Sequence, residues 1–490
     1  MLRFAWLDVK SLWFDEAFSL KLARQPLWLV ARITSDQDAH PPLYYLLLHG
    51  WITLFGTSET ALRSLGALCS SVAATVTGVL GIKMVGRQVG LLAALLAAVS
   101  PLQVMAAQEA RMYPLATLLV LLSWWALWEA VGGRRWMWVL YSLFAVTGLY
   151  THYLFLAALG SHGAFLMAGR HRAHLRGWLL AVLGIVVAYV PWWPVFFDSL
   201  FSGRGWPFVR PPVGLRTLPD LLALFSFGGD AFETGGYFTV GTLPLAAYPA
   251  VLFPFLAWLT LGAWSLRRRV SALKALALYW MAPVLACYAM SFKFNIFYGR
   301  YFSIFWPGFA ILMAAGVLEL SAVFSRAWSK GLVVASVLLV LLYAVPVLHA
   351  FYFDPRQHRF NWRDAAKLVM AEAAPNDLVV VVPAFAITPW AYYFKGPQSV
   401  MPMLPKEFLN PSSLLARGNA EDPADLAYWK GRMKSLSAAS PTLWLVVTKP
   451  MPAHAAKRLD AILAGICRYV RYEDFRHVEV VKCVRNDVKP

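Results

Sequence analysis

Carboxylates that could accept a proton stand near the start of the chain, in a polar segment that precedes long apolar runs. Residues 11–19 read Ser-Leu-Trp-Phe-Asp-Glu-Ala-Phe-Ser and place Asp15 beside Glu16. Charge close to a membrane is energetically costly, so an acidic pair in this position is a functional candidate by default. A carboxylate of this kind can act as general base for an incoming hydroxyl. Asp15 and Glu16 are the candidates here; the structural alternative for Asp15 is that it caps a helix over 15–25.

Basic residues that could hold a phosphate stand near the ends of apolar runs. Arg111 and Arg300 suit this role, because the planar guanidinium binds phosphate oxygens in a bidentate manner. Lys293 is a third candidate, although a lysine at a helix end commonly serves only as an anchor. The alternative for the two arginines is that each extends its charged head to the membrane interface.

A second polar set consists of Asp38, His40, Glu109 and His152. We predict that these residues serve an acceptor or, alternatively, ligate a divalent metal ion. The Asp-x-His spacing of Asp38 and His40 is a weak metal signal. A single histidine is more often a hydrogen-bonded core residue, so the sequence leaves open whether a metal ion binds here and which metal it would be.

The composition is that of a membrane protein. Of the 490 residues, 59% are apolar and 14% are charged, whereas soluble domains carry about 25% charge. The net charge of +18 comes from basic residues in short clusters between apolar runs. This pattern follows the positive-inside rule and does not require a nucleic-acid partner.

Ten apolar runs approach the length of about 20 residues that a bilayer crossing requires. They lie near 60–83, 88–106, 112–130, 136–151, 153–169, 176–196, 243–265, 273–291, 301–322 and 331–350. One alternating set of loops holds 13 basic residues and no Asp or Glu. By the positive-inside rule this set faces the cytoplasm, and the other set faces outside together with everything after 352.

The opening loop, residues 1–58, raises a question of topology. Ten spans put the N-terminus outside, so we expect one further transmembrane helix before Met1; the alternative is a short tail translocated on its own. Within this loop, 15–25 and 42–55 are predicted to be amphipathic helices on the membrane surface. The outer loop at 198–242 is rich in Gly and Pro and is predicted to close over a ligand.

After Asp354-Pro355 the pattern becomes that of a small soluble α/β domain. Apolar alternation and helical periodicity predict helices at 362–374, 388–394 and 453–466 and strands at 377–382, 442–448, 467–472 and 477–484. The predicted division is therefore a transmembrane domain over 1–352 and an extracytoplasmic domain over 353–490. No catalytic motif is visible in the second domain, which favours a cap or an acceptor-docking module.

Two of the four cysteines are predicted to pair. If the last hairpin turns near residue 475, Cys467 lies opposite Cys483, at the distance of directly facing strand residues. An extracytoplasmic compartment would supply the oxidising conditions.

Several of these segments carry a resemblance. The chain resembles the bacterial relatives of the dolichyl-phosphate-mannose–protein mannosyltransferases, which are GT-C membrane glycosyltransferases and include the lipid A aminoarabinose transferases. The resemblance rests on the ordered motifs at 11–19, 40–49, 108–113, 150–153 and 299–302. It also implies a transmembrane helix before the first motif, which this sequence lacks.

The resemblance implies inverting transfer of a sugar from a polyprenyl-phosphate carrier to a lipid, glycan or protein acceptor. The reaction would take place on the outer face of a bacterial cytoplasmic membrane. The resemblance assigns the role of general base to Asp15, with Glu16 in support, because Asp15 matches the acidic residue of the family's first outer loop. A transporter or flippase of lipid-linked sugars is the alternative, although no internal repeat of the transporter type is visible. Convergence of carboxylates and arginines in one outward site would favour the enzyme.

Overall fold

The computed structural model describes the greater part of the chain. The described residues are 1–38, 40–168, 171–201, 212–228, 248–294, 296–324, 326–355, 360–403, 423–438, 440–449, 451 and 453–486. They form two compact units. The first comprises Met1–Leu7 and Leu22–Phe353, and the second comprises Asp8–Lys21 and Asp354–Pro490.

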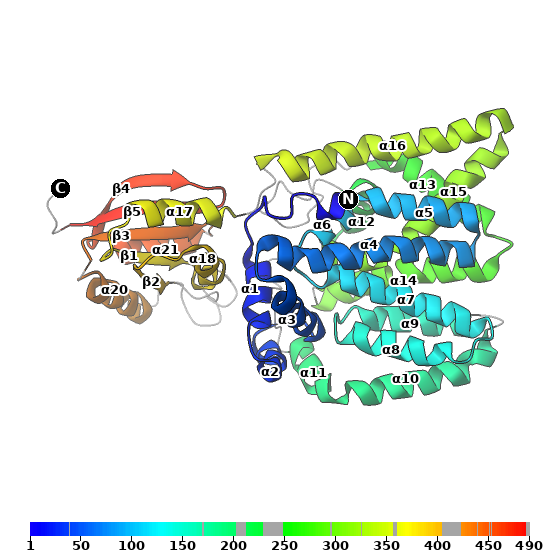
Figure 1. The fold of residues 1–490 in the computed structure, drawn as a ribbon, viewed down its shortest axis with the longest axis horizontal. Coiled ribbons are helices and arrows are strands. Elements are labelled where there is room, and N and C mark those ends of the chain that lie inside the picture. Colours follow the sequence, from blue (N-terminus) through cyan, green and yellow to red (C-terminus); the bar gives the residue numbers. More distant parts are fainter. Residues whose placement is uncertain are drawn as a thin grey trace. The chain divides into compact units, whose positions relative to one another are not determined.

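The first unit is helical (Figure 1). In chain order it contains η1 (Leu2–Phe4), the end of α1 (Phe14–Ala23), α2 (Leu27–Gln37), α3 (Leu43–Phe55), α4 (Glu59–Met84), α5 (Arg87–Val99), α6 (Pro101–Ala107), α7 (Tyr113–Val131), α8 (Met137–Leu149), α9 (Phe155–Met167), η2 (Arg172–His174), α10 (Leu175–Tyr189), η3 (Val190–Trp192), α11 (Trp193–Phe201), α12 (Thr217–Phe227), α13 (Tyr248–Ser265), α14 (Val270–Phe294), η6 (Gly299–Phe305), α15 (Trp306–Val323) and α16 (Arg326–Phe353).

Each of the ten predicted apolar runs is helical over most of its described residues, and the fold is that of a polytopic membrane bundle. Among the described residues, six helices are long and apolar enough to cross a membrane. The pair α5 and α6 is bent by 57° at Ser100 and would make a seventh span. The helices α8 and α9 have 13 residues each, about 20 Å of helix, which is less than the roughly 30 Å of a hydrocarbon core.

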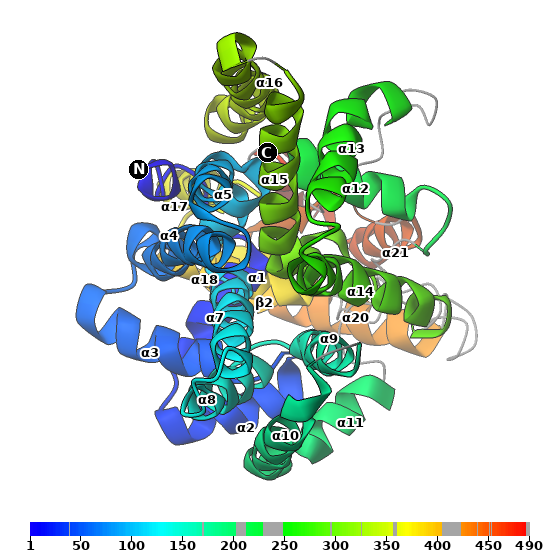
Figure 2. The ribbon, with the colours of Figure 1, turned by 90° about the vertical axis from the view of Figure 1, so that its right-hand side faces the viewer.

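The centre of the helical unit is α15, which packs against α4, α5, α13, α14 and α16 (Figure 2). Close approach to α13 depends on glycine: a Cβ at Gly316 would overlap the carbonyl of Trp258. Small residues at helix crossings are the usual means of tight packing in membranes. At opposite edges of the unit in Figure 1, α16 and the span containing α10 leave most of their surface for lipid.

The described residues of the opening loop contain three α-helices. The predicted helices at 15–25 and 42–55 are present as α1 and α3, and α2 lies between them and was not predicted. The predicted mobile loop at 198–242 falls largely outside the described residues, as do its Gly229-Asp230 and Gly235-Gly236 pairs. Its described part includes α12, which packs against α6 and α13.

The second unit is built on one five-stranded sheet with the order β2-β1-β3-β5-β4. Its elements are α17 (Trp362–Glu372), β1 (Leu378–Val382), η8 (Ala384–Ala386), α18 (Ile387–Tyr393), β2 (Ser399–Pro402), α20 (Pro423–Ser437), β3 (Thr442–Thr448), α21 (Ala453–Leu463), β4 (Cys467–Asp474) and β5 (Val478–Arg485). The strand β1 is buried along its whole length, because α17 and α18 pack on one face of the sheet and α20 and α21 on the other. Both-sided burial explains its unbroken run of apolar residues.

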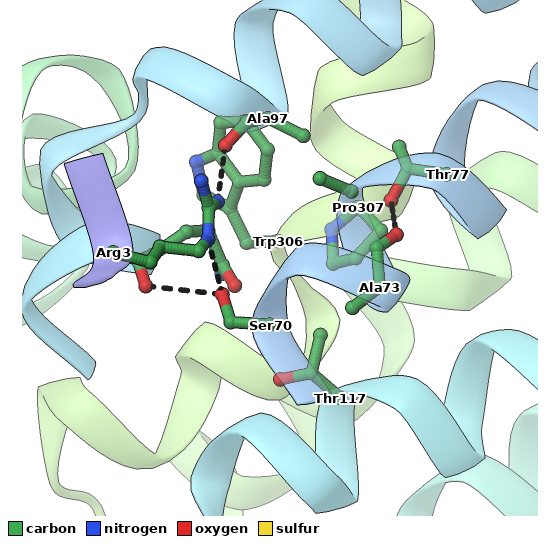
Figure 3. Close-up of a pocket in the computed structure, with 10 residues that line it drawn as sticks. Arg3, Ser70, Ala73, Thr77, Ala97, Thr117, Trp306 and Pro307 are labelled. Carbon is green, nitrogen blue, oxygen red and sulfur yellow. Dashed lines mark hydrogen bonds between the residues drawn. The ribbon is translucent and has the colours of Figure 1, made fainter. Parts of the chain in front are cut away.

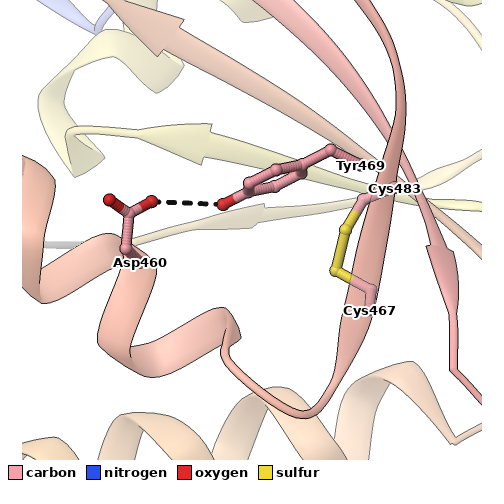
Figure 4. The surroundings of a disulfide bond; sticks show 4 residues. All are labelled: Asp460, Cys467, Tyr469 and Cys483. Carbon is pink, nitrogen blue, oxygen red and sulfur yellow. Dashed lines mark hydrogen bonds between the residues drawn. A yellow bond between two sulfur atoms is a disulfide. The ribbon is translucent and has the colours of Figure 1, made fainter.

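The predicted disulfide between Cys467 and Cys483 is present (Figure 4). The predicted register is wrong by two residues, because Cys467 pairs with Arg485 and Cys483 pairs with Tyr469. The turn is centred later than residue 475, and a bulge lies between Tyr469 and Arg471. The two cysteine Cα atoms are 5.7 Å apart, a normal separation for a disulfide.

Candidate active site

One group of polar and aromatic side chains gathers where helices of the first unit begin or end. We call it the polar cluster; it consists of Asp38, His40, Tyr45, Glu109, Arg111, Tyr113, His152, Tyr298, Arg300 and Tyr301. These residues come from the α2–α3 loop with the first turn of α3, the α6–α7 turn with the start of α7, the α8–α9 turn, and the start of η6 with the residue before it. A backbone hydrogen bond of 3.0 Å from Leu43 N to the Tyr150 carbonyl joins the first and third of these segments.

The first half of the polar cluster surrounds Arg111, which is buried. Its guanidinium donates to the Tyr45 hydroxyl over 3.2 Å and lies 3.3 Å from His40 Nδ1. The Tyr45 hydroxyl donates to one oxygen of Asp38, and His40 Nδ1 lies 3.2 Å from the other. Whether His40 Nδ1 carries a proton therefore decides which residue it bonds to. A protonated Nδ1 donates to Asp38, and an unprotonated Nδ1 accepts from Arg111.

The surroundings of Asp38 keep it ionised. Burial raises the pKa of this carboxyl, but His40, Arg111 and the Tyr45 hydroxyl outweigh burial and lower the pKa to about 2. Opposite charge and hydrogen bonds to the charged form act in the same direction. Asp38 is therefore a fixed negative charge at neutral pH, not a group that exchanges protons.

The second half of the polar cluster surrounds Arg300, which is also buried. Its Nη1 lies 3.6 Å from a carboxylate oxygen of Glu109. The guanidinium carbon lies 5.3 Å from the centre of the Tyr113 ring and 5.0 Å from that of Tyr298. Aromatic faces attract a guanidinium, so the two rings and the carboxylate hold Arg300 in place.

Tyr301 and His152 join the two halves. The Tyr301 ring lies 6.1 Å from the His40 ring, 5.2 Å from that of His152 and 5.7 Å from that of Tyr113, between centroids. The backbone N–H of Leu154 donates to His152 Nδ1 over 3.1 Å. A backbone N–H cannot accept, so His152 is neutral with its proton on Nε2.

The structure thus brings together six of the nine residues predicted from the sequence: Asp38, His40, Glu109, Arg111, His152 and Arg300. The tyrosines of the polar cluster were not predicted, because tyrosines in a membrane protein are common as interface residues. Their signal lay in the motifs themselves, since Tyr45, Tyr113 and Tyr301 each fall inside a segment that carries the family resemblance.

The other three predicted residues are Asp15, Glu16 and Lys293. Asp15 and Glu16 belong to the second unit, in the first turn of α1. The Glu16 carboxylate accepts from the backbone N–H of Trp13 over 3.3 Å, so Glu16, which is buried, caps this helix. Asp15 is half-buried beside it. Lys293 is exposed on the last turn of α14, with its Nζ 5.4 Å from the Phe294 ring centre.

The predicted metal alternative stays a prediction. Among the described residues, no group of three or more His, Cys, Asp or Glu side chains is arranged to hold a metal ion. A dication bound by Asp38 and His40 would also face the guanidinium of Arg111, 3.3 Å from His40 Nδ1. Like charges at this separation repel strongly in a buried site.

Residues 39–195 match the dolichyl-phosphate-mannose-protein mannosyltransferase family. Among curated protein sequences no match is found. The chain has the fold of the GT-C membrane glycosyltransferases, which confirms the predicted resemblance. The partial match, which includes Arg111 and His152, and the fold fit a member of that group.

Three solved structures illustrate the shared fold. ArnT from Cupriavidus metallidurans in the apo state is 14% identical, with a TM-score of 0.59 over 98% of this chain and 95% of that chain. ArnT bound to undecaprenyl phosphate is 16% identical, with a TM-score of 0.59 over 100% and 97%. The Archaeoglobus fulgidus oligosaccharyltransferase tethered with an acceptor peptide is 13% identical, with a TM-score of 0.51 over 92% of this chain and 66% of that chain.

Proposed function

We propose that the chain transfers a sugar from a polyprenyl-phosphate donor to a lipid, glycan or protein acceptor, with inversion at the sugar carbon. The observation that carries the proposal is the pair of buried arginines, Arg111 and Arg300, in one polar cluster on a GT-C fold. The ArnT structure with undecaprenyl phosphate and the family match support a polyprenyl-phosphate carrier. The sugar and the acceptor stay open.

In the proposed reaction the acceptor hydroxyl attacks the sugar carbon from the face opposite the phosphate. The carbon–oxygen bond to the phosphate breaks, and the phosphate leaves with the electron pair while the acceptor's proton passes to a carboxylate. We assign that carboxylate to Asp15, as the resemblance implies. A positioned general base contributes a factor of about 10²–10⁴ to the rate.

The proposed role of Arg111 and Arg300 is to hold the donor phosphate and to stabilise its departure. The donor is a phosphodiester with one negative charge, and the product is a monoester that gains charge as the bond breaks. Fixed cations therefore stabilise the transition state more than the bound donor. Ionised Asp38 keeps His40 and the Arg111 side of the polar cluster oriented without competing for the proton.

We place the reaction on the outer face of a bacterial cytoplasmic membrane, with the second unit also outside. Two observations support this side. The opposite loops hold 13 basic residues and no acidic ones, and the second unit contains a disulfide, which is typical of an oxidising compartment.

The direct test is to incubate the purified protein with a panel of polyprenyl-phosphate sugars and membrane extract, and to identify products by mass spectrometry. We expect one sugar to leave its carrier and to appear on an acceptor, with release of polyprenyl phosphate in equal amount. Movement of intact donor across a vesicle bilayer without cleavage would instead support the flippase alternative and overturn the proposal.

A further inference from the structure

The break between α5 and α6 leaves a backbone carbonyl without its helical partner. In a continuous helix the carbonyl of Ala97 would accept from the N–H of residue 101. That residue is Pro101, which has no N–H. An unpaired buried carbonyl costs as much as a lost hydrogen bond, so another donor is needed at this point.

Arg3 supplies that donor from far away in the sequence (Figure 3). Its Nη2 donates to the Ala97 carbonyl over 2.7 Å and its Nη1 to the Ala98 carbonyl over 3.0 Å. Its Nε donates to Ser70 Oγ on α4 over 2.7 Å. The guanidinium is buried and thus fixes the end of α5 against α4.

Two glutamines on and after α6 connect this break to the polar cluster. Gln103 Nε2 donates over 2.8 Å to the carbonyl of Ser303 in η6, the element that carries Arg300. Gln108, which directly precedes Glu109, donates over 2.7 Å to the carbonyl of Ala5. Both glutamines are buried.

We propose that Arg3, Gln103 and Gln108 are positioning residues for the two arginine-bearing segments. Arg3 holds the broken helix, and α6 then sets the backbone of η6 through Gln103. Gln108 ties the α6–α7 turn to the carbonyl of Ala5, two residues after Arg3. In this way one short helix fixes the spacing between Arg111 and Arg300. The inference rests on the proposed function, because it assigns those arginines to the donor phosphate.

The first experiment compares Gln103→Met with a matched control, Thr77→Val, in the transfer assay. Met keeps the size of Gln but removes the donor to Ser303. Thr77 lines the same pocket as Gln103, yet its hydroxyl bonds only within α4, to the Ala73 carbonyl over 2.8 Å. We expect Gln103→Met to raise KM for the donor at least about fivefold, because it removes one buried hydrogen bond next to a donor-binding residue. Thr77→Val should change KM less than twofold.

The kinetic pattern separates positioning from a general loss of structure. Partial unfolding lowers the amount of active enzyme, and hence the apparent kcat, while KM stays unchanged. A wild-type KM in Gln103→Met, with the wild type active, would overturn the inference and leave the proposed function standing. A wild-type protein that neither binds polyprenyl phosphate nor transfers sugar would overturn the proposed function itself.

A double-mutant cycle between Arg3 and Pro101 tests the first link. Pro101→Ala restores an N–H at the position that faces the Ala97 carbonyl, so that carbonyl depends less on Arg3. We expect Arg3→Met to lower the Tm clearly in the wild-type background and by a smaller amount in the Pro101→Ala background. Equal losses in both backgrounds would mean that the two residues are not coupled, and would overturn the assignment of Arg3.

Discussion

The basic side chains at the two ends of α7 differ in how far they are exposed to solvent. At the end near Tyr113, Arg300 and Glu109 lie together with side chains only 7% and 11% exposed. At the other end, Glu129, whose side chain is 9% exposed, binds Lys83 and Arg134 over 2.9 Å each, and the side chains of these two cations are 43% and 57% exposed. The helix has 19 residues, so about 28 Å separates the two arrangements.

This difference indicates which charges serve orientation and which serve chemistry. Lys83 and Arg134 keep their charged groups partly in water, so these two cations cost little to maintain. A buried pair carries a desolvation penalty of several kcal/mol per ion, so stability alone does not account for two such arginines in one cluster. We infer that the exposed end sets the direction of the chain in the membrane and that the polar cluster carries the reaction.

The prediction with the largest expected effect concerns the orientation of the chain in the membrane. A reporter fused after Lys330 should behave as cytoplasmic, and one fused after Pro490 as extracytoplasmic, because of the charge bias between the two sets of loops. Each fusion gives an all-or-none signal with a phosphatase or fluorescent reporter. A cytoplasmic C-terminus would place the polar cluster on the wrong side for the proposed reaction.

The next prediction removes the buried charges while it keeps the site neutral. Arg300→Met combined with Glu109→Gln avoids a lone buried charge, so the protein should fold. We expect transfer to fall by about 10²–10³, the usual loss when a group that stabilises developing charge is removed. Arg134→Gln, at the exposed end, is the control and should change the rate less than twofold. Equal rates in both variants would remove the distinction between the two ends.

The disulfide offers a test in the second unit. Replacing Cys467 and Cys483 by Ser should lower the unfolding free energy of that unit by about 3 kcal/mol, as expected for a loop of this size, measured by denaturant unfolding. Cys69 and Cys287 are free, so the denatured wild type should show two reactive thiols without reductant and four with it. Four thiols under both conditions would contradict the bond.

The smallest expected effect is a dependence of stability on pH. Asp38 has a folded pKa of about 2, below its unfolded value of about 3.9. Its contribution is therefore complete above about pH 4 and is lost as the pH falls toward 2, a change of about 2 kcal/mol. Unfolding of the wild type at pH 5 and pH 2.5 should show this extra loss, and Asp38→Asn should lack it. Parallel losses in the two proteins would contradict the hydrogen-bonded role of Asp38.

Local patterns predicted the second unit well. The strand expected at 442–448 is β3 with the same bounds, and the helix expected from 453 is α21. The short edge strand β2 and the helix α20 were missed. The four residues of β2 are too few for alternation to be seen, and α20 has no strong apolar face.

The polar cluster was only partly predictable. Ordered motifs singled out Arg111 and Arg300, because a charge at the end of an apolar run is conspicuous. They could not single out Arg3, whose partners are two carbonyls more than 90 positions away. The need for Arg3 comes from Pro101 and from the folded path of the chain, and neither is visible in the residues around it.

The central claim is that Asp15 is the base of the proposed transfer, and Asp15→Asn tests it most directly. Asn keeps the size and the capping ability of Asp, and Glu16 already accepts the Trp13 N–H, so α1 should persist. We expect the purified variant to bind polyprenyl phosphate like the wild type but to transfer sugar at least about 10²-fold more slowly, since it lacks the base. Near-normal transfer by Asp15→Asn, measured by mass spectrometry of the product, would contradict the assignment of the base.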